Sequence, residues 1–262
     1  MPKYPTCTFC GKNDSKPSKE HVIPKWLARE FPNATWELTN RLTKRVRKSK
    51  KYIHIIAHYP CERCNNGWMH ELEDAASPIL IPLIHGQPAT LSVHDQLTIR
   101  TWFFMKAVMY DLHSEREKPH PRSPEGKKPR PRYFENGEHR ALMSTLFMHP
   151  AYMVFIGRYK GNQHGVIQED HSGVSVGKRD DLKPLGDPVR GYAVTFMIEH
   201  LVLQIFCAKV DPALPFYLRD FRPFYAEIGR SPDAVRWPPP RDFNDALLDK
   251  FINRWSEDAP LP

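Results

Sequence analysis

Two short stretches, CTFC at residues 7–10 and CERC at residues 61–64, decide how the first part of this chain folds. Each is a Cys-x-x-Cys knuckle, and two such knuckles supply the four thiolates that one tetrahedral Zn²⁺ takes in a structural site. Four of the five cysteines fall in these pairs, which makes a chance arrangement a poor explanation. Because four thiolates leave no open coordination position, we predict a structural zinc held by Cys7, Cys10, Cys61 and Cys64.

A zinc staple of this kind would bring two further motifs together. The motif EHVIP, residues 20–24, lies between the knuckles, and NNGWM, residues 65–69, follows the second knuckle directly. The staple would place Glu20 and His21 near Asn65. A carboxylate, an imidazole and an amide in one cluster can bind a hard divalent cation and activate a water molecule. We therefore expect a hydrolytic site here, with an ion other than the zinc.

The order of these motifs resembles the HNH endonuclease family, the ββα-metal nucleases, in the form that is stapled by a four-cysteine zinc site. The resemblance covers about residues 5–75. It implies two antiparallel strands and a helix around a catalytic ion. It also implies that His21 is the general base, and that Glu20 and Asn65 hold one Mg²⁺ or Mn²⁺ on the scissile phosphate.

The sequence departs from the family pattern at two points. The family often has a middle asparagine that orients the histidine, and Asn40 is the nearest match, separated from Asn65 by a long basic insertion. The family helix often carries a further metal ligand. His70 and Glu73 are the candidates, although neither shares Asn65's face on a regular α-helix.

The chain is basic, with a formal net charge of +8 and a pI near 9.2. Such a charge favours a polyanionic partner, because Lys and Arg release counterions from phosphates. Seven of the eleven residues from 41 to 51 are Lys or Arg. A solvated loop explains this run about as well as a phosphate-contacting hairpin arm does. The nucleic-acid contacts that we predict are Lys44, Arg45, Arg47, Lys48, Lys50 and Lys51.

We predict an α+β fold with an N-terminal ββα-metal module at residues 1–80 and a larger α+β domain at residues 81–262. The Pro-, Lys- and Arg-rich segment 116–132 should be a loop. Shorter patterns predict further elements: helices over 24–31, 65–81 (bent or ended by Pro78), 93–113 (capped by Ser92), 138–149 and 242–255, a strand over 152–159, and short strands at 166–168 and 174–176. The apolar stretch 191–210 fits either strands or a buried helix.

The function expected from these features is metal-dependent hydrolysis of DNA, with RNA left open as a substrate. One alternative is a non-catalytic, zinc-dependent nucleic-acid-binding module, and another is an effector that a protein partner activates. By the same resemblance one site carries one metal ion, so cutting both strands would need two copies, as in a homodimer, or two successive events. The start of the chain lacks a secretory signal and no apolar run approaches 18 residues, so we expect a cytoplasmic protein with no membrane contact.

Overall fold

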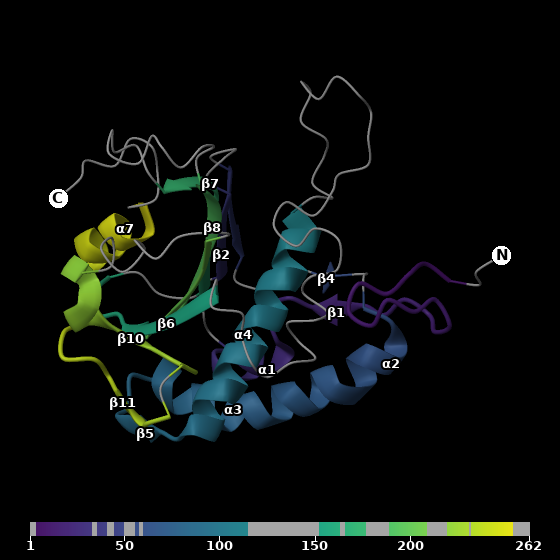
Figure 1. Cartoon of the computed structure of the whole chain (residues 1–262), viewed down its shortest axis with the longest axis horizontal. Helices are drawn as coiled ribbons and strands as arrows, with labels where there is room; N and C mark the ends of the chain where they lie inside the picture. The colour runs from purple at the N-terminus through teal and green to yellow at the C-terminus, as the bar shows by residue number, and fades with distance from the viewer. Residues whose placement is uncertain are drawn as a thin grey trace.

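The computed structural model describes residues 4–32, 36–40, 45–49, 56–57, 60–114, 152–162, 166–176, 189–208, 219–230 and 232–253. Within these residues helices and antiparallel strands are mixed, so the α+β class is confirmed (Figure 1). The predicted loop 116–132 and helix 138–149 lie outside the described residues. None of the described helices combines the length and the hydropathy that crossing a membrane requires.

The first part of the chain alternates short strands and helices. Strand β1 pairs with β4 in antiparallel fashion, and β2 pairs with β3 to form a separate hairpin. The elements in order are β1 (Glu20–His21), α1 (Lys25–Glu30), β2 (Trp36–Asn40), β3 (Arg45–Ser49), β4 (Ile56–Ala57), α2 (Glu62–Cys64), η1 (Asn65–Met69) and α3 (His70–Ile84).

The rest of the described chain is built around a five-stranded antiparallel sheet with the order β10-β6-β9-β8-β7. Hairpin strand β2 lies against β7 at the edge of this sheet. The elements are β5 (Ala89–Leu91), α4 (Val93–Ser114), β6 (Tyr152–Arg158), β7 (Val166–Val176), β8 (Val189–Ile198), β9 (Leu201–Ala208), η4 (Arg219–Phe224), β10 (Tyr225–Glu227), β11 (Val235–Trp237) and α7 (Asp245–Asn253).

The apolar stretch 191–210 forms the strands β8 and β9. Phe196 and Ile198 face the core that contains α4, whereas Met197 faces a second core beside α7. A strand that is buried on both faces carries apolar residues at successive positions, and this hides the two-residue period by which a strand is recognised. The two segments predicted at 166–168 and 174–176 are one strand, β7, with an irregularity between Ser172 and Val174.

Helix α4 lies between the sheet and the β1–β4 pair (Figure 1). It begins as predicted at Ser92, whose hydroxyl accepts the backbone N–H of Asp95 at 3.2 Å, while the Asp95 carboxylate accepts the Ser92 N–H at 2.9 Å. This reciprocal cap satisfies donors that a helix start leaves unpaired.

One apolar core continues from the cysteine knuckles through α3 and α4 to the sheet. The predicted boundary at residue 80 falls inside α3, where Leu80 itself is fully buried. Helix α3 does not end at Pro78 but continues to Ile84 with a second proline, Pro82, inside it. A proline in a helix removes one hydrogen bond, and the burial of four apolar side chains on the same helix offsets that cost: Ala76, Leu80, Leu83 and Ile84.

Candidate metal centre and the adjoining pocket

The four knuckle cysteines lie in one cluster. Their Sγ atoms all lie within 4.8 Å of one another. The Sγ atoms of Cys7 and Cys64 are 3.9 Å apart, and those of Cys10 and Cys61 are 3.8 Å apart. A tetrahedral site with Zn–S bonds of about 2.3 Å has S···S edges of about 3.8 Å. The cluster therefore has the dimensions to hold a metal ion such as zinc, and these distances are far too long for a disulfide.

Backbone contacts hold the two knuckles together. In the first knuckle, Gly11 donates its N–H to the Cys7 carbonyl at 2.9 Å and adopts a φ of 72°, a conformation that favours glycine. The Cys61 N–H points at the Cys7 Sγ at 3.3 Å, as the amides around a metal-bound thiolate do. Ser18 N–H donates to the Pro60 carbonyl at 2.8 Å, which ties the approach to β1 to the second knuckle.

The protein environment raises the pKa of some of the thiols and lowers that of another. Burial raises the pKa of Cys7 and of Cys64. Burial alone would also raise the pKa of Cys10, but hydrogen bonds from the Lys12 backbone and from neighbouring side chains outweigh it and lower the pKa to about 7. One of those side chains is Arg63, whose guanidinium reaches the Cys10 Sγ at 3.9 Å. The lowered pKa favours the thiolate form of Cys10, which is the form that binds a metal.

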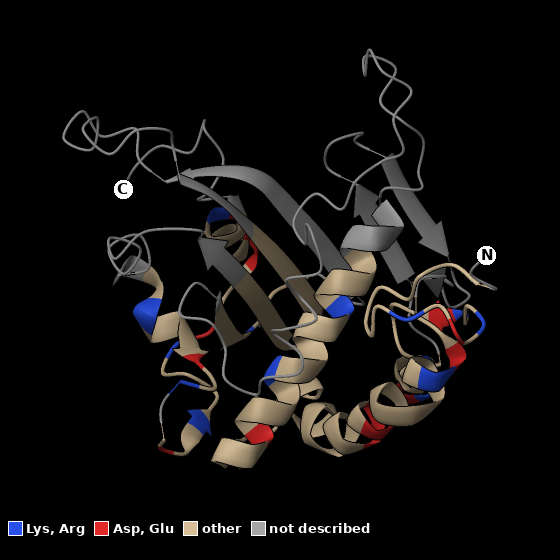
Figure 2. Ribbon diagram, turned by 45° about the vertical axis from the view of Figure 1, so that its right-hand side comes forward, with Lys and Arg blue, Asp and Glu red and all other residues tan. Residues whose placement is uncertain are grey.

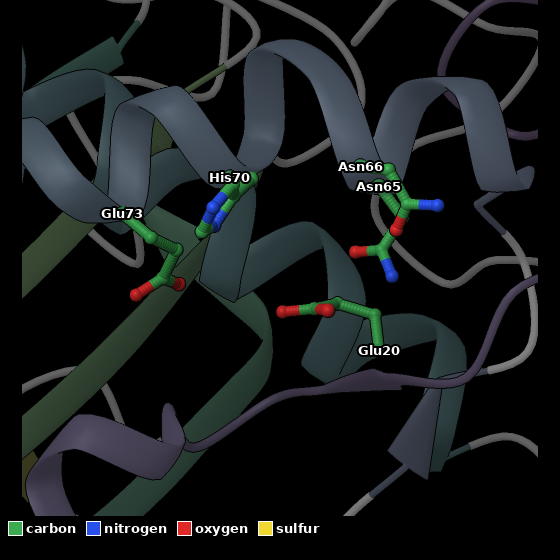
Figure 3. Close-up of a pocket in the computed structure, with 5 residues that line it drawn as sticks. All are labelled: Glu20, Asn65, Asn66, His70 and Glu73. Atoms are coloured by element: carbon green, nitrogen blue, oxygen red, sulfur yellow. The ribbon is translucent and has the colours of Figure 1, made fainter.

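A polar pocket of about 250 Å³ adjoins the second knuckle. Figure 3 shows Glu20 reaching into it from β1 on one side, while η1 and α3 supply the other side. The carboxylates of Glu20 and Glu73 both project into the space between the helix and the strand. The residues that line the pocket are Glu20, Asn65, Asn66, His70 and Glu73.

The helix places Asn65 and His70 on one side because its first turn is not α-helical. Residues Asn65–Met69 include a kink, because Gly67 has non-helical dihedrals (φ -102°, ψ -118°). Residues on the two sides of such a kink do not keep the relative directions that a regular α-helix gives them. A regular α-helix would point Asn65 and His70 in different directions. In this structure both residues line the pocket.

A hydrogen bond orients the amide of Asn65. Its Nδ2 donates to the Ser18 Oγ at 2.5 Å. The amide oxygen is left on the pocket side (Figure 3). Carboxylate and amide oxygens are ligand types that Mg²⁺ and Mn²⁺ accept, and the binding of such an ion by Glu20 and Asn65 stays a prediction.

His21 does not line this pocket. It follows Glu20 on β1, where it pairs with Ile56 while Glu20 pairs with Ala57. Successive side chains on a strand point to opposite faces, and a phosphodiester that touched both residues would have to reach around the edge of β1. The role of His21 as a base stays a prediction.

Lys106, a buried cation beside this pocket, was not predicted from the sequence. Its side chain is fully buried, and its Nζ donates to the His21 carbonyl at 2.9 Å and to Glu20 Oε1 at 3.3 Å. It also forms an ion pair with Glu73. A signal was present in the sequence, because Lys106 is the one charge within the apolar run 102–110.

The predicted basic contacts fall on and around the β2–β3 hairpin. Three of them, Arg45, Arg47 and Lys48, belong to β3, and Asn40 ends β2 opposite Arg45. The other three lie outside the described residues: Lys44, Lys50 and Lys51. A hairpin arm is therefore observed in the basic region, while its contact with nucleic acid stays a prediction.

No protein-family model, curated protein or solved structure gives a significant match to this chain. The function is therefore proposed from the chemistry of the cluster and the pocket.

Proposed function

We propose that this chain is a metal-dependent endonuclease of the HNH type that hydrolyses DNA phosphodiester bonds. The observation that carries the proposal is the pocket that Glu20 and Asn65 both line, directly after a cysteine cluster of zinc-binding dimensions. In this proposal the four cysteines hold zinc and keep the two segments together. Glu20 and Asn65 hold one Mg²⁺ or Mn²⁺, with His70 as a further candidate ligand.

The residues of the protein would have separate roles in the reaction. An ion in the pocket would stabilise negative charge on the phosphate and on the leaving 3′ oxygen. His21 would accept the proton of the attacking water, which is the role of a general base. Ser18 would keep the amide oxygen of Asn65 directed at the ion. The basic β2–β3 hairpin would add phosphate contacts that do not depend on base sequence.

The first test is cleavage of supercoiled plasmid DNA with Mg²⁺ or Mn²⁺, with and without EDTA, by the wild-type protein and by His21→Ala. Loss of a general base should slow cleavage by about 10²–10⁴-fold. Zinc content and Mn²⁺ affinity should stay at the wild-type values, because His21 belongs to neither donor set. The matched control is His94→Ala, an exposed histidine at the start of α4, which should cut as fast as the wild type.

A His21→Ala protein that cuts as fast as the wild type would remove His21 from the mechanism. A wild-type protein that binds DNA but does not cut it with either ion would favour the second candidate, a non-catalytic zinc-dependent binding module. One observation favours that candidate: Lys106 already pairs with Glu20, as it would in a purely structural cluster.

A further inference from the structure

Burying the charged side chain of Lys106 costs folding free energy. It lies in the middle of α4 with no exposed side-chain surface, among residues that are otherwise apolar. Figure 2 shows the charged positions of α4 as isolated patches on a helix that is otherwise uncharged, and its two basic residues are Arg100 and Lys106. Taking an ammonium group out of water costs several kcal/mol even after relaxation, and an apolar side chain of similar volume often gives a more stable protein. A role at the pocket would explain why a lysine is present.

The contacts of Lys106 involve both pocket carboxylates. Its Nζ contacts Glu20 Oε1 at 3.3 Å, and it meets Glu73 Oε1 in an ion pair rather than a hydrogen bond. The other oxygen of Glu73 accepts the indole N–H of Trp26 at 2.7 Å. Both oxygens of Glu73 are therefore engaged by the protein, which makes this carboxylate a poor metal ligand even though it lines the pocket.

We propose that Lys106 is a positioning residue that occupies the space between Glu20 and Glu73, and so confines a bound divalent ion to the side of Glu20 that faces Asn65. The ammonium cancels one of the two carboxylate charges. It also fixes Glu20 Oε1 and the adjacent His21 carbonyl, so both the ligand and the proposed base are tied to α4. The inference deepens the proposed nuclease function and rests on it.

The proposal predicts opposite changes in metal binding and in turnover for Lys106→Met. Without the ammonium, the two carboxylates would attract a divalent ion into the space between them. Mn²⁺ affinity should rise about tenfold or more, because a charge of the same sign has been removed at contact distance. The kcat of plasmid cleavage should fall about tenfold or more, because the ion no longer sits against Asn65. A purely structural lysine would not tighten Mn²⁺ binding.

Two variants make this test specific. In the double variant Glu73→Gln, Lys106→Met, the glutamine can still accept the Trp26 N–H while one carboxylate charge is gone, so the gain in Mn²⁺ affinity should disappear. Arg100→Met is the matched control. It removes another buried cation from α4. Arg100 donates a hydrogen bond of 2.6 Å to the Gly229 carbonyl and does not line the pocket, so its loss should leave Mn²⁺ affinity unchanged.

The measurements are Mn²⁺ titration by calorimetry, zinc content and thermal unfolding of the full chain. A folded Lys106→Met protein that binds Mn²⁺ as the wild type does, or more weakly, overturns the proposal. If Lys106→Met does not fold, Glu73→Gln alone decides the question. In that variant Lys106 has only Glu20 to neutralise, so Mn²⁺ binding should weaken about tenfold; unchanged binding would overturn the proposal.

Failure of the nuclease function would look different. In that case the wild-type protein itself binds no Mn²⁺ and cuts no DNA, yet Lys106→Met should still gain Mn²⁺ binding between the two carboxylates. If the wild type binds no Mn²⁺ and Lys106→Met gains none, the inference about Lys106 is wrong as well.

Discussion

The cysteine cluster and the polar pocket lie side by side, but the chain builds them in different ways. Each half of the cluster comes from four consecutive residues, and the two halves only have to meet. The pocket takes a carboxylate from β1, an amide from η1 and a carboxylate from α3, and a buried lysine from α4 stands behind them. A metal site made from local spacing can be recognised directly in a sequence, whereas Glu20 and Asn65 could be brought together only through the staple and Lys106 was missed.

The two sites also differ in what depends on them. The cluster joins the segment that leads into β1 to the start of η1, and β1 and η1 supply the pocket residues Glu20 and Asn65. Among the described residues, no side chain that lines the pocket is a member of the cysteine cluster. Substitutions in the cluster should therefore weaken Mn²⁺ binding in the pocket, whereas substitutions in the pocket should leave zinc binding unchanged. The following experiments test that one-way dependence.

The largest effect is expected for Cys61→Ser. A structural zinc site contributes about 10–16 kcal/mol of apparent binding free energy, which is comparable with the whole stability of an ordinary domain. The variant should lose its zinc equivalent, its cooperative thermal unfolding and its Mn²⁺ binding together. These properties are measured by elemental analysis, calorimetry and Mn²⁺ titration.

The control for this variant is Cys207→Ser, which changes the one cysteine outside the knuckles. It should keep its zinc equivalent and its Mn²⁺ affinity. A zinc-free Cys61→Ser protein that still folded and bound Mn²⁺ would show that the cluster is not needed to build the pocket.

The fold could be predicted where the sequence pattern is local. The helix start at Ser92 and the strand predicted over 152–159 follow from a capping pair and a run of β-formers, and the structure has both, the strand as Tyr152–Arg158. Glu20 and Asn65 could be proposed as neighbours only because the knuckles imply a staple. The kink at Gly67, between Asn65 and His70, leaves no periodic signal, since it is shorter than the window in which a period is detected.

An intermediate effect is expected for Glu20→Gln, which alters the pocket and leaves the cluster intact. The glutamine keeps an oxygen for Lys106 to contact but loses the charge that attracts a divalent ion. Mn²⁺ affinity should fall about tenfold or more, because a charged oxygen ligand is replaced by a neutral one. Zinc content should stay at one equivalent and the melting temperature should change little. If this variant lost zinc, the dependence between the two sites would run both ways.

The smallest effect is expected for Ser18→Ala, which loosens the contact between the two sites without removing a ligand. Its Oγ accepts the Asn65 Nδ2 at 2.5 Å, and among the described residues this contact fixes the orientation of that amide. Losing one buried hydrogen bond costs about 1 kcal/mol, or about fivefold in an equilibrium constant, and Mn²⁺ affinity should weaken by that factor. Ser92→Ala is the matched control, because losing a helix cap costs a similar stability, about 1 kcal/mol, at a place remote from the pocket.

If the two variants lost equal stability and only Ser18→Ala weakened Mn²⁺ binding, the effect would come from the aim of the Asn65 amide and not from general destabilisation. Equal Mn²⁺ affinities in the two variants would mean that the amide is held by the turn of η1 itself, and the link between the two sites would then be the backbone alone.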